Sequence, residues 1–108
     1  MAEKLNDSTF DAYINENELP VLADFYNDSC IPCKRISPII SKAEVQYSGK
    51  INFVKVNCQM CPKLVEKYEI TSAPTLVLFV DKKEANRHCG VISADAFDLF
   101  IKNSVKGE

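Results

Sequence analysis

One stretch of the chain, residues 21–33, decides the fold; it reads VLADFYNDSCIPC. Its first six residues are apolar except Asp24, which is typical of a central strand covered on both faces. Apolar residues then recur at helical spacing over about 33–47. Cys30 and Cys33 therefore stand where a buried strand ends and a long helix begins.

The spacing of these two cysteines predicts redox chemistry. At positions i and i+3 of a first helical turn, two sulfurs can approach within bonding distance, and the unpaired N–H groups favour a thiolate at Cys30. The thiolate attacks a disulfide, and Cys33, one turn further in, would resolve the mixed disulfide. Pro32 restricts the loop between them. Two small buried hydrophobes are the alternative, which explains either cysteine but not the pair at this junction.

The rest of the chain alternates helices and strands. We expect a first helix over about Thr9–Glu16 with Ser8 as its N-cap, a kink in the second helix at Pro38, and a last helix capped by Ser93. Pro62 suits the first position of a short helix. Further strands are predicted at 51–56, 75–80 and about 84–89. Strands separated by helices pair in parallel, and the short link before the last strand predicts a hairpin, so we expect an α/β mixed sheet with helices on both faces.

Length and composition limit the class of protein. The chain has 108 residues, enough for one hydrophobic core, so we expect a single domain over residues 1–108. A net charge of −2 argues against nucleic-acid binding, and the lack of an apolar run of about 20 residues argues against a membrane span. Residues 1–7 are polar and show no secretory signal, which favours the cytoplasm, where the five cysteines would be kept as thiols.

Several segments, taken in order, resemble the thioredoxin family over nearly the whole chain. They are residues 23–34, Pro38, residues 53–57, residues 70–76 and Gly90. The resemblance implies the thioredoxin fold, with a mixed central sheet of four to five strands flanked by helices on both faces. It also implies a thiol–disulfide oxidoreductase in which Cys30 is the nucleophile and Cys33 the resolving thiol.

The same resemblance assigns supporting roles. Asp24 matches a buried acid that relays protons to and from the resolving cysteine, because burial raises the pKa of a carboxyl toward neutrality. Lys55 matches a lysine that tunes this acid. Pro74 matches a proline that the family keeps cis, so that Ala73 presents its backbone to a substrate peptide. Without the resemblance, Asp24 would be a structural acid, Lys55 a solvated strand residue and Pro74 a trans proline at a strand start.

Two residues of the cysteine loop depart from the family's usual pattern. Ser29 stands where a tryptophan usually precedes the first cysteine, and Ile31 replaces a glycine. The loss of the large ring predicts a more open site. We place Ile31 and Pro32 among the substrate-binding residues; Ile31 either supplies apolar contact surface or tunes the thiolate by desolvation.

A second pair with the same spacing, Cys58 and Cys61, follows the strand at 51–56. One interpretation is a second redox pair that acts as a switch or an electron store. Another is a zinc site formed with Cys30 and Cys33, although the distance along the chain exceeds the usual pattern. The third, which we favour, is two partly buried thiols with no task. Cys89 is expected to pack as a small apolar residue.

The sequence thus predicts an enzyme that reduces protein disulfides by a dithiol–disulfide cycle. Disulfide-containing proteins are the expected substrates, and the resemblance implies a thioredoxin reductase as electron donor. We expect a monomer that needs no cofactor or metal. One alternative is a binding module that uses the loop at Pro74 with incidental cysteines. Another is a glutaredoxin-like protein that uses glutathione, which the position of the loop proline makes less favourable.

Overall fold

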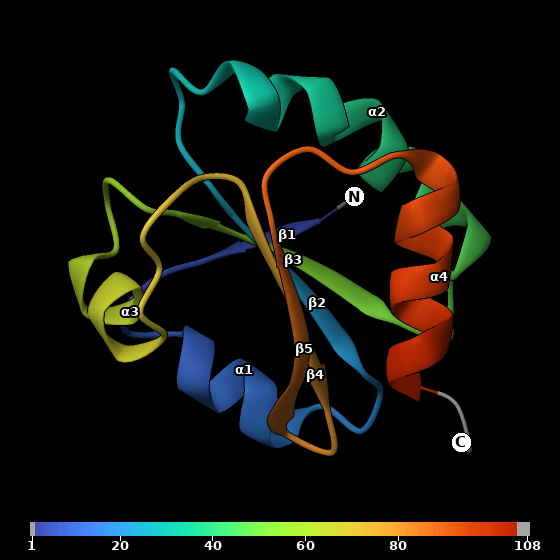
Figure 1. Cartoon of the computed structure of the whole chain (residues 1–108). Coiled ribbons are helices and arrows are strands. Elements are labelled where there is room, and N and C mark those ends of the chain that lie inside the picture. The colour runs from blue at the N-terminus through green and yellow to red at the C-terminus, as the bar shows by residue number, and fades with distance from the viewer. Residues whose placement is uncertain (1, 106–108) are drawn as a thin grey trace.

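A five-stranded mixed sheet forms the centre of the computed structural model, which describes residues 2–105 (Figure 1). The elements in chain order are β1 (Glu3–Leu5), α1 (Phe10–Glu16), β2 (Val21–Tyr26), α2 (Ile31–Gln46), β3 (Asn52–Asn57), α3 (Pro62–Lys67), β4 (Thr75–Val80), β5 (Lys83–Cys89) and α4 (Ala94–Val105). The strands lie in the order β1-β3-β2-β4-β5. This is the thioredoxin fold that the sequence predicted.

The strand pairing places β2 at the centre of the sheet. β3 runs parallel to both β1 and β2, whereas β4 is antiparallel to β2 and to β5. In this register Asp24 of β2 lies directly between Lys55 of β3 and Leu76 of β4. The mixed sheet and the hairpin of β4 and β5 are therefore as predicted.

Helices cover both faces of the sheet, because side chains alternate between faces along each strand (Figure 1). Helices α1 and α3 pack on one face, where Phe10, Ile14 and Leu64 meet Ala23 and Phe25 of β2. Helices α2 and α4 pack on the other face; their buried residues there are Ile36, Ile40, Ala43, Phe97, Phe100 and Ile101. Asp24 shares this second face with Leu22, two positions before it in the strand.

Two details differ from the sequence prediction. The short strand β1 was not recognised, since three residues carry too little pattern. Ser8 is not the N-cap of α1: Thr9 takes that position, and the Asn6 side chain accepts hydrogen bonds from the N–H groups of Ser8 and Thr9 at 2.9 and 3.1 Å. As predicted, helix α2 does not end at Pro38. The Ser93 cap is confirmed, since its hydroxyl accepts from the Ala96 N–H at 3.1 Å.

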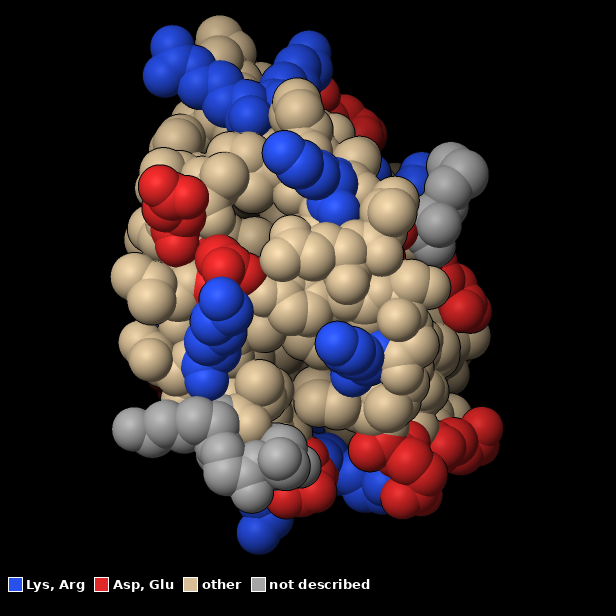
Figure 2. Space-filling model, turned by 90° about the vertical axis from the view of Figure 1, so that its right-hand side faces the viewer, with Lys and Arg blue, Asp and Glu red and all other residues tan. Residues whose placement is uncertain are grey.

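The surface over α2 and α4 carries basic and acidic side chains side by side (Figure 2). Within residues 2–105, no helix combines the length and apolar character that a membrane span requires. The predicted single domain, residues 1–108, includes residues 1 and 106–108, which lie outside the described range.

Candidate active site

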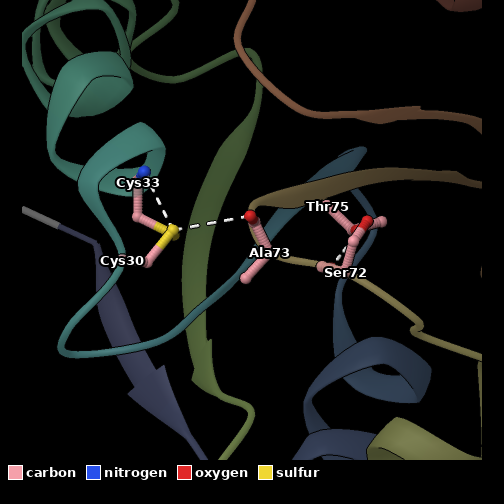
Figure 3. Close-up of a disulfide and its surroundings, with 5 residues drawn as sticks. All are labelled: Cys30, Cys33, Ser72, Ala73 and Thr75. Carbon is pink, nitrogen blue, oxygen red and sulfur yellow. Dashed lines mark hydrogen bonds between the residues drawn. A yellow bond between two sulfur atoms is a disulfide. The ribbon is translucent and has the colours of Figure 1, made fainter.

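The cysteine pair occupies the junction between β2 and α2. Cys30 is the N-cap of α2, and Cys33 lies in its first turn. A disulfide joins them, with their Cα atoms 5.2 Å apart (Figure 3). Cys30 is half-buried, whereas Cys33 is only 8% exposed. Of the two sulfurs, the first is therefore the one that a partner can reach.

Two backbone groups surround the Cys30 sulfur (Figure 3). The Cys33 N–H donates to Cys30 Sγ at 3.1 Å, and the carbonyl oxygen of Ala73 lies 3.4 Å from the same sulfur. In the reduced protein the N–H and the positive end of the α2 dipole favour a thiolate at this position. This N-cap position is the one that a nucleophilic cysteine requires.

The loop before β4 brings the backbone of Ala73 to the disulfide. The Ala73–Pro74 peptide bond is cis, and Pro74 is buried. Two hydrogen bonds hold the loop: the Gly90 N–H donates to Pro74 O at 2.8 Å, and Thr75 Oγ1 donates to Ser72 O at 2.7 Å. The loop and the cysteines, over 40 positions apart in the sequence, therefore form one surface.

Asp24 is near the cysteine pair, since it shares a pocket with Cys33, and it is 7% exposed. It lines an open pocket of about 190 Å³ together with Cys33 and Lys55. Its Oδ1 atom has no hydrogen-bond partner among the described residues. Burial raises the pKa of this carboxyl to about 6, and the charge of Lys55 opposes part of that rise. A carboxyl with such a pKa can exchange a proton near neutral pH.

Lys55 lies across from Asp24 on β3, but its ammonium contacts another group. Its Nζ is 4.6 Å from the centroid of the Tyr26 ring. Tyr26 and Asn27 also line the pocket of Asp24. Neither residue was predicted to belong to the site, although the two-residue period of a strand puts Tyr26 on the same face as Asp24.

The two residues that depart from the family pattern are both on the surface. Ser29 is exposed, and Ile31, next to Cys30, is 67% exposed. Pro32 is exposed as well. An apolar side chain and a proline ring thus border the reachable sulfur on the α2 side.

The second cysteine pair differs from the first, since both thiols are free. Cys58 is half-buried and Cys61 is 1% exposed, with its sulfur 3.9 Å from the carbonyl oxygen of Leu5. Burial and the neighbouring thiol raise the pKa of Cys58 to about 11, and burial also raises the pKa of Cys61. These thiols are therefore weak nucleophiles at neutral pH.

The structure does not assemble the four-cysteine zinc site considered from the sequence. Within residues 2–105, no group of three or more His, Cys, Asp or Glu side chains could hold a metal ion.

Cys89 differs from expectation: it is exposed and lies opposite Thr75, whose hydroxyl is 3.7 Å from its sulfur. An edge strand leaves this side chain uncovered.

Two cysteines that can exist as two thiols or as one disulfide exchange two electrons with other disulfides. At the amino end of a helix and beside a cis proline in this fold, such a pair defines a thioredoxin-like thiol–disulfide oxidoreductase. Comparison with known proteins agrees: the sequence model of the thioredoxin family matches residues 1–103.

Thioredoxins of other organisms are similar to this chain in sequence. Thioredoxin of Rickettsia felis is 32% identical over 105 residues, which cover 97% of this chain and all of that protein. Thioredoxin 1 of Nostoc sp. is 35% identical over 91 residues, 84% of this chain and 85% of that protein. A chloroplastic M-type thioredoxin of Spinacia oleracea is 37% identical over 92 residues, 85% of this chain and 49% of that protein.

The chain belongs to the thioredoxin family. Together with the Cys30–Cys33 pair, this membership makes it a thiol–disulfide oxidoreductase that acts on protein disulfides. Its partners are, in general terms, disulfide-containing proteins and a reductase.

Proposed function

We propose that Cys30 is the nucleophile of a reductive cycle and Cys33 the resolving thiol. The Cys30 thiolate attacks one sulfur of a substrate disulfide, which forms a mixed disulfide and expels the other substrate sulfur as a thiolate. The Cys33 thiolate then attacks Cys30 Sγ, which forms the Cys30–Cys33 disulfide and releases the second substrate thiolate. Two electrons pass to the substrate. The main support for Cys30 as the nucleophile is the 3.1 Å hydrogen bond from the Cys33 N–H to Cys30 Sγ.

Asp24 is the proposed base for the resolving step. Cys33 is buried and needs to lose its proton before it can attack, and Asp24 shares a pocket with it. A pKa of about 6 lets this carboxyl accept the proton near neutral pH and return it later to solvent. Lys55, the cation nearest along the sheet, tunes this carboxyl.

The substrate is proposed to bind along the loop at Ala73 and Pro74. The Ala73 carbonyl oxygen lies 3.4 Å from Cys30 Sγ, so an extended peptide whose sulfur reaches Cys30 passes beside this backbone and can pair with it. Ile31 and Pro32 border the same sulfur and supply apolar contact from the other side. The exposure of the Ile31 side chain favours a role in apolar contact with the substrate over a role in tuning the thiolate by desolvation.

A thioredoxin reductase is the proposed source of electrons, and the cytoplasm the proposed compartment. Reduction of the Cys30–Cys33 disulfide needs a donor, and the relatives named thioredoxin point to a reductase of that kind rather than to glutathione. A cycle that starts from thiols requires a reducing compartment. We propose that the protein acts as a monomer and itself carries no cofactor.

An insulin-reduction assay with matched cysteine variants tests this proposal. Cys30→Ser is expected to abolish the reduction of insulin by dithiothreitol-recycled protein, because serine cannot form the mixed disulfide. Cys58→Ser, with the same spacing to its partner cysteine, is the control and is expected to keep wild-type turnover. Equal rates for wild type and Cys30→Ser would instead favour a binding module. Efficient turnover with glutathione and its reductase alone would favour a glutaredoxin-like protein.

A further inference from the structure

The Tyr26 ring lies on the same strand as Asp24 and against the Lys55 ammonium. Asp24 and Tyr26 are two residues apart on β2, so their side chains lie on the same face of the sheet. Lys55 on β3 is in direct register with Asp24, and it is the only basic side chain of that strand. A lysine side chain in this register is long enough to reach either neighbour.

The ammonium lies over the ring and not against the carboxyl. Lys55 Nζ is 4.6 Å from the Tyr26 centroid, within the range of a cation–π interaction. No hydrogen bond or ion pair joins it to Asp24, whose Oδ1 has no partner among residues 2–105. The ammonium thus acts on the carboxyl through space but is not in contact with it.

Other charged and titratable groups also face this carboxyl. Helix α2 contributes Cys33 and Lys34, the loop after β2 contributes Asp28, and these line the same pocket as Asp24. Cys58, which follows β3, interacts electrostatically with Asp24. On the β4 side the neighbour in register is the apolar Leu76. Lys55 is therefore the only cation that adjoins Asp24 within the sheet among the described residues.

We propose that Tyr26 is a positioning residue: its ring holds the Lys55 ammonium off the Asp24 carboxyl and so sets the pH at which this carboxyl exchanges its proton with Cys33. The inference rests on the proposed role of Asp24 as the base. Direct contact with a cation typically lowers the pKa of a carboxyl by about 1 to 3 units. Such a carboxylate would be a poor base near neutral pH, because it would hold its proton too weakly.

Carboxyl-carbon NMR titration of the oxidised protein tests the ring's effect directly. In Tyr26→Leu the freed ammonium is expected to move onto Asp24 and lower the pKa of the carboxyl by about 1 unit or more. Tyr26→Phe keeps the ring and is the matched control, with a wild-type titration. A wild-type titration in Tyr26→Leu, or an equal shift in Tyr26→Phe, would overturn the proposal.

A double variant shows whether the ring acts through the lysine. Lys55→Met removes the cation and is expected to raise the pKa of Asp24. In that background Tyr26→Leu is expected to change the titration by less than about a third of the shift that it causes alone. An equal shift in both backgrounds would mean that the ring acts by packing or solvation, and the positioning role would be wrong.

One measurement needs no variant, which matters because Tyr26 is 8% exposed and its replacement could impair folding. The ε-methylene protons of Lys55 in the wild-type protein are expected to be shifted upfield by the ring current of Tyr26. An ordinary lysine shift would overturn the proposal even if Tyr26→Leu does not fold.

The rate of insulin reduction against pH then separates this inference from the proposed function. If Tyr26→Leu lowers the pKa of Asp24 and the acidic limb of the profile moves with it, both stand. If the carboxyl titration moves but the profile does not, Tyr26 positions Lys55 as proposed and the role of Asp24 as base is wrong. If neither moves, the positioning role is wrong and the role of Asp24 is unaffected.

Discussion

The two cysteine pairs of this chain have the same spacing and similar places in the fold, yet different chemistry. Each follows the end of a central strand and leads into a helix, β2 into α2 for Cys30 and Cys33, β3 into α3 for Cys58 and Cys61. The first pair is a disulfide and the second is two thiols.

The difference lies in the surroundings of the sulfurs. Cys30 is half-buried and its sulfur accepts an N–H from the first turn of a helix of 16 residues. Cys61, the N-cap of a helix of 6 residues, makes no side-chain capping hydrogen bond, and its side chain is buried in the core. Both pairs have one half-buried and one buried cysteine, so the difference is the N–H donor at Cys30, which stabilises a thiolate there, whereas burial without such a donor opposes one. A Cys-X-X-Cys motif is therefore reactive only where the fold supplies such surroundings.

The largest expected effect is the difference in alkylation rate between the two pairs. In the reduced protein at pH 7, Cys30 is expected to react with iodoacetamide about 50-fold faster than Cys58. A Cys-X-X-Cys thiol at a helix N-terminus has a pKa of about 7, whereas the pKa of Cys58 is about 11, so far less of Cys58 is thiolate at pH 7. A thiolate of higher pKa is intrinsically more nucleophilic, but this offsets only part of the difference. Peptide mass spectrometry over time measures both rates. Equal rates would remove the distinction between the pairs.

The next effect concerns the carboxyl that underlies the first pair. Because the pKa of Asp24 rises from 3.8 to about 6 on folding, the neutral form stabilises the fold below pH ~4, and this stability is lost as pH rises through ~6. Between pH 4 and pH 8 the wild type should lose about 2 kcal/mol of unfolding free energy relative to Asp24→Asn. Urea denaturation at both pH values measures it. Asp28→Asn, at an exposed position, is the control. If Asp28→Asn abolished the pH-dependent loss of unfolding free energy seen in the wild type, the assignment to Asp24 would be wrong.

The smallest effect tests the structural role of the second pair. Cys61→Ser should lower the unfolding free energy by about 1 to 2 kcal/mol, because a hydroxyl replaces a sulfur in a core position that is 1% exposed. Cys58→Ser, at a half-buried position, should cost less than half as much. Thermal melts of both variants would show this order, and a reversed order would mean that Cys61 is not the better-packed thiol.

Much of this molecule could be predicted from local pattern. The strand at 21–26, the helix after Cys30 and the hairpin near the end followed from apolar periodicity and turn residues. The short strand β1 was not predicted, because its place in the sheet depends on pairing with β3 and not on its own three residues. The cap of α1 was placed one residue early, since Asn6, Ser8 and Thr9 are all good capping residues and only the hydrogen bonds select among them.

The sequence by itself determined the order of the elements and the place of the first cysteine pair, since periodicity and spacing are local properties of a chain. Only the tertiary structure decided which of the two pairs has a sulfur that accepts a helix N–H, because that contact depends on how the chain enters the helix. It also decided that the Lys55 ammonium lies over Tyr26 instead of on Asp24. That choice depends on the register of two strands and on competing contacts in space, and no stretch of sequence contains it.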